Sequence, residues 1–570
     1  MNILGIGGYS HDSAAALVCD GKLVAGVAEE RLTRVKHQGG VPRRAVRYCL
    51  DAAGLAPGDI DHAGCYMRPF KRLARRLPYR LRQCVRSPLY SAGYIGYELL
   101  HNARYVYGMR RLFAGSGAST GNGLELHFMD HHQAHAAAAF LVSPFDSAAL
   151  LTIDYIGEWI ATWAGVGKGI TITQRHVKHY PHSLGVLYSA ITDYLGFRRA
   201  SDEYKVMGLA AYGEPEFYDA FRRIVRSRSD GWYDIDLSWM RCHYQPGSMK
   251  GYFSDKFLER FGPKRNQGEP VEQRHKNIAA SAQRVLEDVV LDILEKLHAD
   301  TGEKNLCMAG GVALNCAMNG RMLRESPFDD IYVQPAAGDD GIAIGAAFQL
   351  YHQITGADRG FVMEDARIGP EFSDSQIRGF LENAKIDYET PEYLEGYTAR
   401  LIAGGNIVGW FQGRAEFGPR ALGARSILAD PTRADMKDLL NRHVKNREDF
   451  RPFAPSVLED RAAEYFTGCR TSPFMLFVYP VEQDKRDMVP AITHVDGTAR
   501  VQTVSNAINP RYYRLIKAFE KIRGVPLVLN TSFNVMGEPI VNTPADAVKC
   551  FYTTGMDALV MGNHVVRKRP

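Results

Sequence analysis

The chain has 570 residues, of which 45% are hydrophobic and 23% charged, and its formal net charge is +5. This length exceeds what a single hydrophobic core supports and predicts two or more domains, and the modest charge does not indicate nucleic-acid binding. The nine cysteines show no CxxC spacing, which argues against a disulfide framework and a Cys-type zinc site and favours a reducing cytoplasm.

The first residues, MNILGIGGYSHD, lack the basic and apolar regions of a signal peptide. No apolar run in the sequence reaches the length that a membrane-spanning helix needs. We therefore expect a cytoplasmic protein without a membrane partner.

The N-terminal part of the sequence repeats one plan. Residues 2–6 are expected to form a strand that opens into a polar segment, and two more strands follow, joined at Asp20-Gly21, a strong hairpin signal. About 150 residues on, residues 149–153 form the next expected strand, followed by a polar loop at 154–158 and a second hairpin. The repetition predicts a duplicated actin- or sugar-kinase-like fold with a nucleotide cleft; two unrelated hairpins are the alternative.

The segment from Arg68 to Arg86, RPFKRLARRLPYRLRQCVR, carries eight cations and no acid. The cations recur three or four residues apart, with Leu73, Leu77 and Leu81 between them. This spacing predicts an amphipathic helix that is interrupted at Pro78 and packs its leucines inward. A nucleic-acid patch is the alternative.

A pair of histidines suggests a metal site. On a helix, His131 and His135 share a face, four residues apart, where two imidazoles chelate a transition metal well. A third ligand would come from Asp339 or Asp340, in a turn flanked by glycines. Such a set suits Fe(II), Mn(II) or Zn(II), and ordinary surface or core histidines are the alternative.

A long helical pattern covers residues 277–301, and a short strand at 305–308 then ends in a glycine turn at Gly310 and Gly311. A strand-to-helix turn of this kind is typical of nucleotide binding. The sequence contains no GxxxxGK[ST] motif, so a P-loop is excluded as the mode of ATP binding. A change in composition predicts a boundary between residues 355 and 370, which gives domains 1–355 and 370–570.

Cations and glycines are concentrated between Phe411 and Ser456. The glycines let the backbone approach a ligand closely, and arginines with backbone N–H groups on such turns suit a polyphosphate. A basic surface loop is the alternative. The cations are Arg414, Arg420, Arg425, Arg433, Arg442, Lys445, Arg447 and Arg451.

A second polar stretch follows an apolar run that begins at Val525. It contains Asn530, Thr531, Ser532 and Asn534 and is expected to end a strand with hydroxyl and amide groups. A local side-chain turn would explain any one of these residues. Together with the Arg-rich block, the stretch predicts a nucleotide or acyl-phosphate pocket.

These blocks resemble the NodU/CmcH family of O-carbamoyltransferases over nearly the whole chain. The motifs are YSHDSAAAL, EERLTRVKH, DHHQAHAA, EYKVMGLAAYG, MAGGVALNC, GDDGIAIGAA, FQGRAEFGPRALGARSILADP, NREDFRPFAPS and NTSFNVMGEPIV. The resemblance implies an α/β protein with a duplicated, TsaD-like N-terminal domain and a YrdC-like C-terminal domain. It also implies an aminoglycoside such as tobramycin as the acceptor, in antibiotic biosynthesis.

For the C-terminal domain, the resemblance implies synthesis of carbamoyl-adenylate from carbamoyl phosphate and ATP, with Mg(II). Positioning and charge neutralisation would do most of the catalysis. The implied site residues are Lys445 and Arg447 in a KxR element, Ser532 and Asn534 in an SxN element, and Arg420 and Arg500 as further cations.

For the N-terminal domain, the resemblance implies transfer of the carbamoyl group to a hydroxyl, with adenosine held at Gly310 and Gly311. TsaD-type proteins hold a metal through an HxxxH pair and an aspartate. The matching residues are His131, His135 and Asp339 as ligands, most simply of Fe(II), with His132 and Asp340 structural.

The general base would be His11 or Asp12 in the first loop. Because an aminoglycoside is polycationic, its site should carry carboxylates. The candidates are Asp154, Glu158, Asp202 and Glu203. Two other functions stay open: a tRNA-modifying carbamoylation factor that uses the basic segment on RNA, and a non-catalytic, actin-like nucleotide switch.

One position departs from the family pattern. Where these proteins usually have Asp-Gly-x-Gly-Glu, this chain has Tyr155 in place of the first glycine. Tyrosine disfavours a positive φ angle and adds a ring at the expected cleft. Three interpretations are open. The tyrosine weakens transfer, its ring stacks on adenine or a sugar, or the residue is tolerated because φ is negative here.

Overall fold

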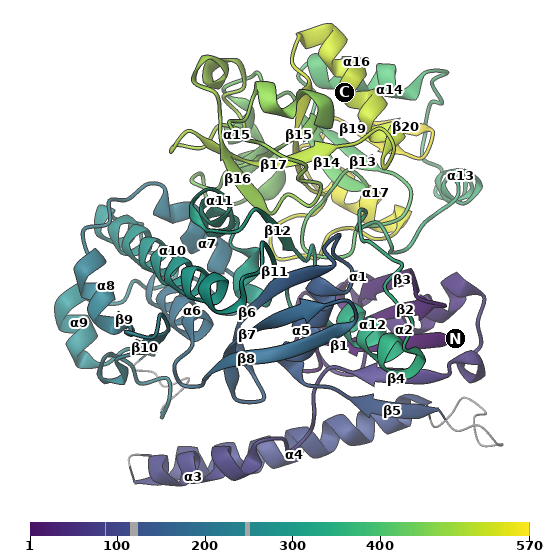
Figure 1. The fold of residues 1–570 in the computed structure, drawn as a ribbon. Helices are drawn as coiled ribbons and strands as arrows, with labels where there is room; N and C mark the ends of the chain where they lie inside the picture. The colour runs from purple at the N-terminus through teal and green to yellow at the C-terminus, as the bar shows by residue number, and fades with distance from the viewer. Residues whose placement is uncertain (86, 114–123, 245–250, 569–570) are drawn as a thin grey trace. The chain divides into compact units, whose positions relative to one another are not determined.

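The structure, a computed structural model, describes residues 1–85, 87–113, 124–244 and 251–568 (Figure 1). The chain forms two compact units. The first contains Met1–Val24 and Gly39–Val362, and the second contains Ala25–Gln38 and Met363–Pro570.

The first sheet begins with an antiparallel meander in which β1 pairs with β2, with Ile3 opposite Val18. On its other side β1 pairs in parallel with β4, and β4 pairs in parallel with the edge strand β5. The strands, in spatial order, are β3 (Lys22–Ala28), β2 (Ala14–Cys19), β1 (Asn2–Gly7), β4 (His62–Cys65) and β5 (Glu125–Phe128).

The second sheet repeats this plan. Its central strand β6 pairs antiparallel with β7 and in parallel with β11, and β11 pairs in parallel with the edge strand β12. The strands, in spatial order, are β12 (Asp330–Val333), β11 (Asn305–Ala309), β6 (Ser147–Gly157), β7 (Ile160–Lys168) and β8 (Thr171–His179). Two sheets with the same strand order and the same pairing directions confirm the expected duplicated α/β plan.

Two helices of small residues lie against the two sheets. Helix α12 (Ile342–Thr355) contacts β1, β2 and β4 of the first sheet, and α5 (His131–Phe140) contacts β6, β7 and β11 of the second. The two helices also pack on each other, and a Cβ on Gly345 would collide with the backbone of Ala134. The glycine and the alanine run therefore allow the close approach that fixes the position of α5.

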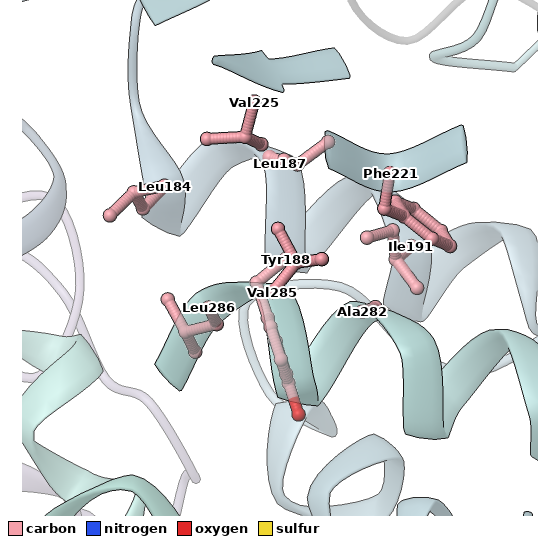
Figure 2. Close-up of a pocket in the computed structure, with 9 residues that line it drawn as sticks. All are labelled: Leu184, Leu187, Tyr188, Ile191, Phe221, Val225, Ala282, Val285 and Leu286. Carbon is pink, nitrogen blue, oxygen red and sulfur yellow. The ribbon is translucent and has the colours of Figure 1, made fainter. Parts of the chain in front are cut away.

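The other helices and a small hairpin complete the first unit. Around α10, the long helix expected from the sequence, a small apolar cavity of about 20 Å³ lies among Leu184, Phe221, Ala282 and their neighbours (Figure 2). The elements are α2 (Arg43–Ala53), α3 (Leu73–Cys84), α4 (Pro88–Phe113), α6 (Leu184–Tyr194), α7 (Glu203–Ala210), α8 (Tyr218–Ile224), β9 (Val225–Ser227), β10 (Tyr233–Ile235), α9 (Asp255–Phe261), α10 (Gln273–Thr301) and α11 (Cys316–Glu325).

Helix α3 corrects two expectations about the basic segment, whose last residue, Arg86, lies outside the described residues. The helix continues through Pro78 rather than stopping there, and Leu77 and Leu81 are exposed. The residue that turns inward is Arg80, whose guanidinium lies 3.8 Å from the ring centroid of Tyr94. Arginine over an aromatic face is a stable buried arrangement, so the cation here replaces the expected leucine contacts.

The second hairpin turns where expected, since β7 ends at Lys168 and β8 begins at Thr171, but the turn before it, between β6 and β7, lies later than expected. Strand β6 continues to Gly157 with a register shift after Ile153, so the segment 154–158 is largely a strand and not a polar loop. The positive φ angles belong to Glu158 and Trp159, at 49° and 88°. Tyr155 therefore has no positive φ angle, which agrees with tolerance at this position.

The second unit is built on an eight-stranded mixed sheet with a core that includes the fully buried Trp410 and Tyr512. The strands, in spatial order, are β16 (Phe477–Pro480), β17 (Thr498–Val504), β15 (Ala454–Leu458), β18 (Leu527–Ser532), β14 (Arg425–Ala429), β13 (Val408–Phe411), β19 (Ala558–Met561) and β20 (His564–Arg567). The helices are α1 (Glu29–Thr33), α13 (Asp374–Asn383), α14 (Leu394–Ala403), α15 (Met436–Leu439), α16 (Pro510–Arg523) and α17 (Pro544–Tyr552). This architecture confirms the expected second α/β domain.

Within the described ranges, none of the helices combines the length and apolar character needed to cross a membrane.

Candidate functional site

A histidine–aspartate cluster lies in the first unit. His131 and His135 are on the first turns of α5, Asp154 is on β6, and Asp339 precedes α12. All four side chains are buried or nearly so. One ligand atom from each lies within 4.8 Å of the others. The structure thus brings together the three residues expected as metal ligands and adds Asp154.

The distances within the cluster match a shared cation site. Nε2 of His131 lies 3.1 Å from Oδ2 of Asp154 and 3.8 Å from Oδ1 of Asp339. Nε2 of His135 lies 3.7 Å and 3.6 Å from the same two oxygens. This His135 nitrogen is buried and has no hydrogen bond of good geometry. A buried imidazole nitrogen aimed between two carboxylates fits a metal ligand better than a core histidine.

The protonation of the cluster reflects its two carboxylates. Burial would lower the pKa of His135, but its interactions with Asp154 and Asp339 raise that pKa to about 9. Burial would raise the pKa of Asp154, yet contacts with His131 and His135 hold it well below its usual value. These interactions favour a proton on His135, which a metal ion would displace on binding.

His132 has a different place. Its Nδ1 lies 2.7 Å from the hydroxyl of Thr152, and its Nε2 lies 3.0 Å from the carbonyl oxygen of Ile160. Burial, with the nearby His131 and His135, lowers its pKa well below the usual value. His132 is thus a neutral side chain that ties α5 to the second sheet.

Backbone packing holds the cluster in place. A Cβ on Gly157 would lie 2.8 Å from Nε2 of His131 and closer still to two ring carbons. Gly310 has a φ angle of 92° and lies against Ile153, and the N–H of Gly311 donates to Oδ1 of Asp154 at 3.0 Å. The glycine turn expected to hold adenosine is therefore directly beside the cluster.

The expected general bases lie at the edge of the cluster. Nε2 of His11 is 3.8 Å from Oδ2 of Asp339, and its Nδ1 is 3.0 Å from Asp12. Asp340 accepts from the backbone of Gly341 at 3.0 Å. His11 is about half exposed, so a substrate could reach it.

The other expected acceptor carboxylates are dispersed. Glu158 lies at the hairpin turn and accepts from the backbone N–H of Arg68. Burial, and then the charge of Asp130, raise the pKa of Glu158 to about 7. Asp202 pairs with Lys205 at 3.1 Å, and Glu203 accepts from Ser189 at 2.7 Å. Asp154, by contrast, belongs to the histidine cluster.

A second candidate site lies in the second unit around Lys445. This lysine ends a π-helical turn, Leu440–Lys445, and the next residue, Asn446, is left-handed with φ 46°. Its ammonium group donates to the carbonyl oxygen of Ser532, and to the carbonyl oxygen and Oδ1 of Asn534 at 2.9 and 3.0 Å. The KxR and SxN elements expected from the sequence are thus in direct contact.

The environment of Lys445 is unusual for a cation. Its side chain is buried, and in the described part of the chain every oxygen that accepts from it is uncharged. Burial, and then the positive charges of Arg447 and Arg451, hold its pKa well below the usual value. A buried ammonium without a carboxylate partner can be stabilised by an incoming phosphate.

Of the remaining expected cations, Arg447 lies beside this lysine, whereas Arg500 and Arg420 lie on other elements of the second unit. The guanidinium of Arg447 lies 4.4 Å from the ring centroid of Phe453 and donates to Asn441 at 2.7 Å. Arg500 lies on β17, near His494. Burial and then the charge of Arg500 lower the pKa of His494 to about 4. Arg420 is half-buried in the loop before β14.

Two residues of the Arg-rich block build the loop instead of facing a ligand. Arg425 is fully buried and donates to four backbone carbonyls, including those of Pro370 and Gln412 at 3.0 Å. The buried Glu416 accepts from the N–H groups of Leu422 and Ala424 at 2.7 Å. The sequence analysis missed Glu416, although an acid inside a block of arginines was a usable signal.

A segment from the N-terminal part of the sequence also belongs to the second unit. Arg31, on α1, donates to the carbonyl oxygen of Gly418 at 2.7 Å, and Arg34 donates to Pro539 at 2.8 Å. The motif EERLTRVKH therefore stabilises both polar loops of this unit, which no local pattern indicated.

Comparison with known proteins is consistent with this two-unit arrangement. Residues 2–348 match the family described as carbamoyltransferase N-terminus, and residues 399–568 match carbamoyltransferase C-terminus. An uncharacterized protein of Synechocystis is 43% identical, with 100% of this chain and 97% of that protein covered. The nodulation protein NolNO of Sinorhizobium fredii is 40% identical over 98% of this chain and 79% of its own length.

Among solved structures, HypF of T. kodakarensis covers 62% of this chain and 48% of its own, with 15% identity and a TM-score of 0.32, which is too low to support an argument. The two family matches together span most of the sequence, and the relatives align along its whole length. The chain therefore belongs to the carbamoyltransferase family.

Proposed function

We propose that this carbamoyltransferase is ATP-dependent, makes carbamoyl-adenylate in its second unit and transfers the carbamoyl group to an aminoglycoside hydroxyl in its first. The observation that carries the proposal is the presence of one candidate site in each unit. The second unit holds a buried lysine among phosphate-type loops, and the first holds a histidine–aspartate cluster beside a glycine turn.

In the first half-reaction, water attacks the phosphorus of carbamoyl phosphate, the bond from phosphorus to the carbamoyl oxygen breaks, and inorganic phosphate and carbamate form. A carbamate oxygen then attacks the α-phosphorus of ATP, the bond to the β-phosphate breaks, and pyrophosphate leaves. Negative charge accumulates on non-bridging oxygens in such a displacement, so fixed cations and N–H donors supply most of the catalysis. Mg(II) would accompany the nucleotide.

Lys445 would bind the phosphates in this step. A phosphate that replaces one of its uncharged acceptors would favour the charged form of the lysine, because it supplies a negative charge that Ser532 and Asn534 do not. Ser532 and Asn534 would then be released to donate their own hydroxyl and amide protons. Arg447, Arg420 and Arg500 would add charge around the leaving pyrophosphate.

In the second half-reaction, an acceptor hydroxyl attacks the carbamoyl carbon, the mixed anhydride breaks and AMP leaves. His11 or Asp12, which lie 3.0 Å apart, would take the hydroxyl proton. Burial would lower the pKa of His11, but its interactions with Asp339 and Asp12 raise that pKa to about 10, so Asp12 is the better base at neutral pH. The backbone at Gly310 and Gly311 would hold the adenosine close to the cluster.

A divalent transition metal, Fe(II) or else Mn(II) or Zn(II), would supply Lewis-acid polarisation of the anhydride when bound. His131, His135 and Asp339 would hold it, and Asp154 stands in position as a further ligand. The chemistry of this donor set, two imidazoles with two carboxylates, fits these ions.

The acceptor assignment rests on charge. Glu158, Asp202 and Glu203 would receive the ammonium groups of an aminoglycoside. Because burial raises the pKa of Glu158 to about 7, this carboxyl would ionise when a cation approaches it.

The test is to incubate the protein with ATP, labelled carbamoyl phosphate and a panel of aminoglycosides, other polyhydroxylated amines and tRNA. Mass analysis would then locate the label. A carbamoylated aminoglycoside is the expected product. Labelled tRNA, or ATP binding without any product, would contradict the proposal.

A further inference from the structure

We propose a second transition-metal site on the first unit, formed by His62, Glu125 and His127 at the edge of the first sheet. The proposal does not depend on the function above, since these residues take no part in it. Its evidence is the strand register, the spacing of the three donor atoms and their exposure.

The register of β4 and β5 puts the three side chains on one face. His62 pairs with Glu125 across the parallel strands, and Gly64 pairs with His127. Residues two apart on a strand point to the same side, so Glu125 and His127 both flank His62. Because the strand backbones fix this arrangement, little conformational entropy is lost when the side chains converge on an ion.

The donor atoms already have the spacing that a tetrahedral ion requires. Nδ1 of His62 lies 3.2 Å from Nε2 of His127. Oε2 of Glu125 lies 3.6 Å from Nε2 of His127 and 3.9 Å from Nδ1 of His62. Zinc with bonds near 2.0–2.1 Å places its ligands roughly 3.3 Å apart. Shifts of a few tenths of an ångström would therefore complete three sides of a coordination sphere.

Access also favours an ion. The side chains of His62 and His127 are 23% and 27% exposed and that of Glu125 is 67% exposed, so solvent can deliver the ion and provide the fourth ligand. Two imidazoles with one carboxylate select Zn(II), Co(II), Ni(II) or Cu(II) over Mg(II) and Ca(II).

This site is separate from the cluster on α5. His62 begins β4, whereas Tyr66, just beyond the end of β4, is the residue whose ring lies 5.6 Å from that of His131. Four residues of strand span about 13 Å. An ion at His62 would join β4 to the edge strand β5, and β5 leads directly to α5. The site would thus fix the strand that leads to His131, a candidate ligand of the first metal site.

The experiment uses the full-length protein, stripped with a chelator and dialysed against Zn(II). Four proteins are compared: wild type, His62→Ala/His127→Ala, His131→Ala/His135→Ala, and a variant with all four changes. We expect two zinc ions per wild-type chain, one in each double variant and none in the quadruple variant. In the His131→Ala/His135→Ala background, Zn(II) should raise the melting temperature, since it binds only the folded form.

His298→Ala is the matched control, because His298 is a partly exposed histidine that packs on Phe328. It should keep both zinc ions. If His62→Ala/His127→Ala does not fold, Glu125→Gln tests the site instead. Loss of this ligand charge should weaken zinc binding by roughly tenfold or more, since even the loss of an outer-shell partner lowers metal affinity by that factor. Equal zinc content in wild type and His62→Ala/His127→Ala, or unchanged affinity in Glu125→Gln, would overturn the site.

Discussion

Gly157→Ala is the substitution that should disturb the histidine cluster most selectively. The added Cβ would lie 2.8 Å from Nε2 of His131, whereas ordinary contacts begin at 3.4 Å. The ring must therefore retreat by at least 0.6 Å, the difference of these two distances, and by more where its carbon atoms are closer still. Metal–ligand distances tolerate about 0.2 Å.

A displacement of this size should remove most of the metal and most of the transfer activity. A misplacement of roughly 1 Å costs about 100-fold in rate at a site that depends on positioning. Pyrophosphate formation should not change, because Gly157 is not part of the second unit. Metal content by elemental analysis and transfer to the acceptor are the two readouts.

Gly58→Ala is the matched control, since a Cβ there would meet nothing within 4 Å. It should retain both metal and transfer. A folded Gly157→Ala protein with full metal content and wild-type transfer would refute the assignment of His131 as a ligand.

Three further substitutions test other parts of the structure. Glu158→Gln should stabilise the protein at pH 8 but not at pH 4.5. Burial raises the pKa of Glu158 from 4.5 to about 7, so the stability that its protonated form contributes is complete below pH 4.5 and is lost as the pH rises through 7. This loss of stability is about 3 kcal/mol. Thermal melts at the two pH values decide this, and equal differences at both would contradict it. Arg425→Met should lower the free energy of unfolding by about 3–5 kcal/mol, because four buried carbonyls lose their donor; a urea titration that gives under 1 kcal/mol would contradict this role. Tyr155→Gly should preserve pyrophosphate formation and preserve or raise carbamoyl transfer, since Tyr155 has no positive φ angle to relieve; a clear drop in steady-state transfer with metal and folding intact would show that the ring belongs to the acceptor site.

Local periodicity predicted much of the first unit. Apolar alternation and the Asp20-Gly21 turn located β1, β2 and β3, and the repeated plan predicted the second sheet. The exact turn between β6 and β7 was not predictable, because Glu158 and Trp159 adopt positive φ angles against their intrinsic preference.

The metal-type cluster was partly predictable. The four-residue spacing of His131 and His135 indicates a shared helix face by geometry alone. Asp154 was assigned to the acceptor instead, since its carboxylate reaches the two histidines only through the packing of α5 on β6. Long-range packing of this kind has no local signature in one sequence.

The basic segments show where charge counts mislead. Arg80 and Arg425 both read as exposed cations, yet both are buried, over Tyr94 and Phe411 respectively. Guanidinium groups can satisfy carbonyls and aromatic faces inside a protein, so the number of arginines in a block does not measure its affinity for phosphate. The role of Arg31 in the second unit was equally hidden, because its partner, Gly418, is far away in the sequence.

The most direct test of the two-site account is the release of pyrophosphate from ATP and carbamoyl phosphate, measured in wild type, Lys445→Ala and His131→Ala, each checked for folding by thermal melt. We predict that Lys445→Ala abolishes pyrophosphate release, since it removes the buried phosphate-binding cation, and that His131→Ala keeps pyrophosphate release while losing carbamoyl transfer. A folded His131→Ala protein that loses pyrophosphate release as completely as Lys445→Ala would contradict the division of the reaction between the two units.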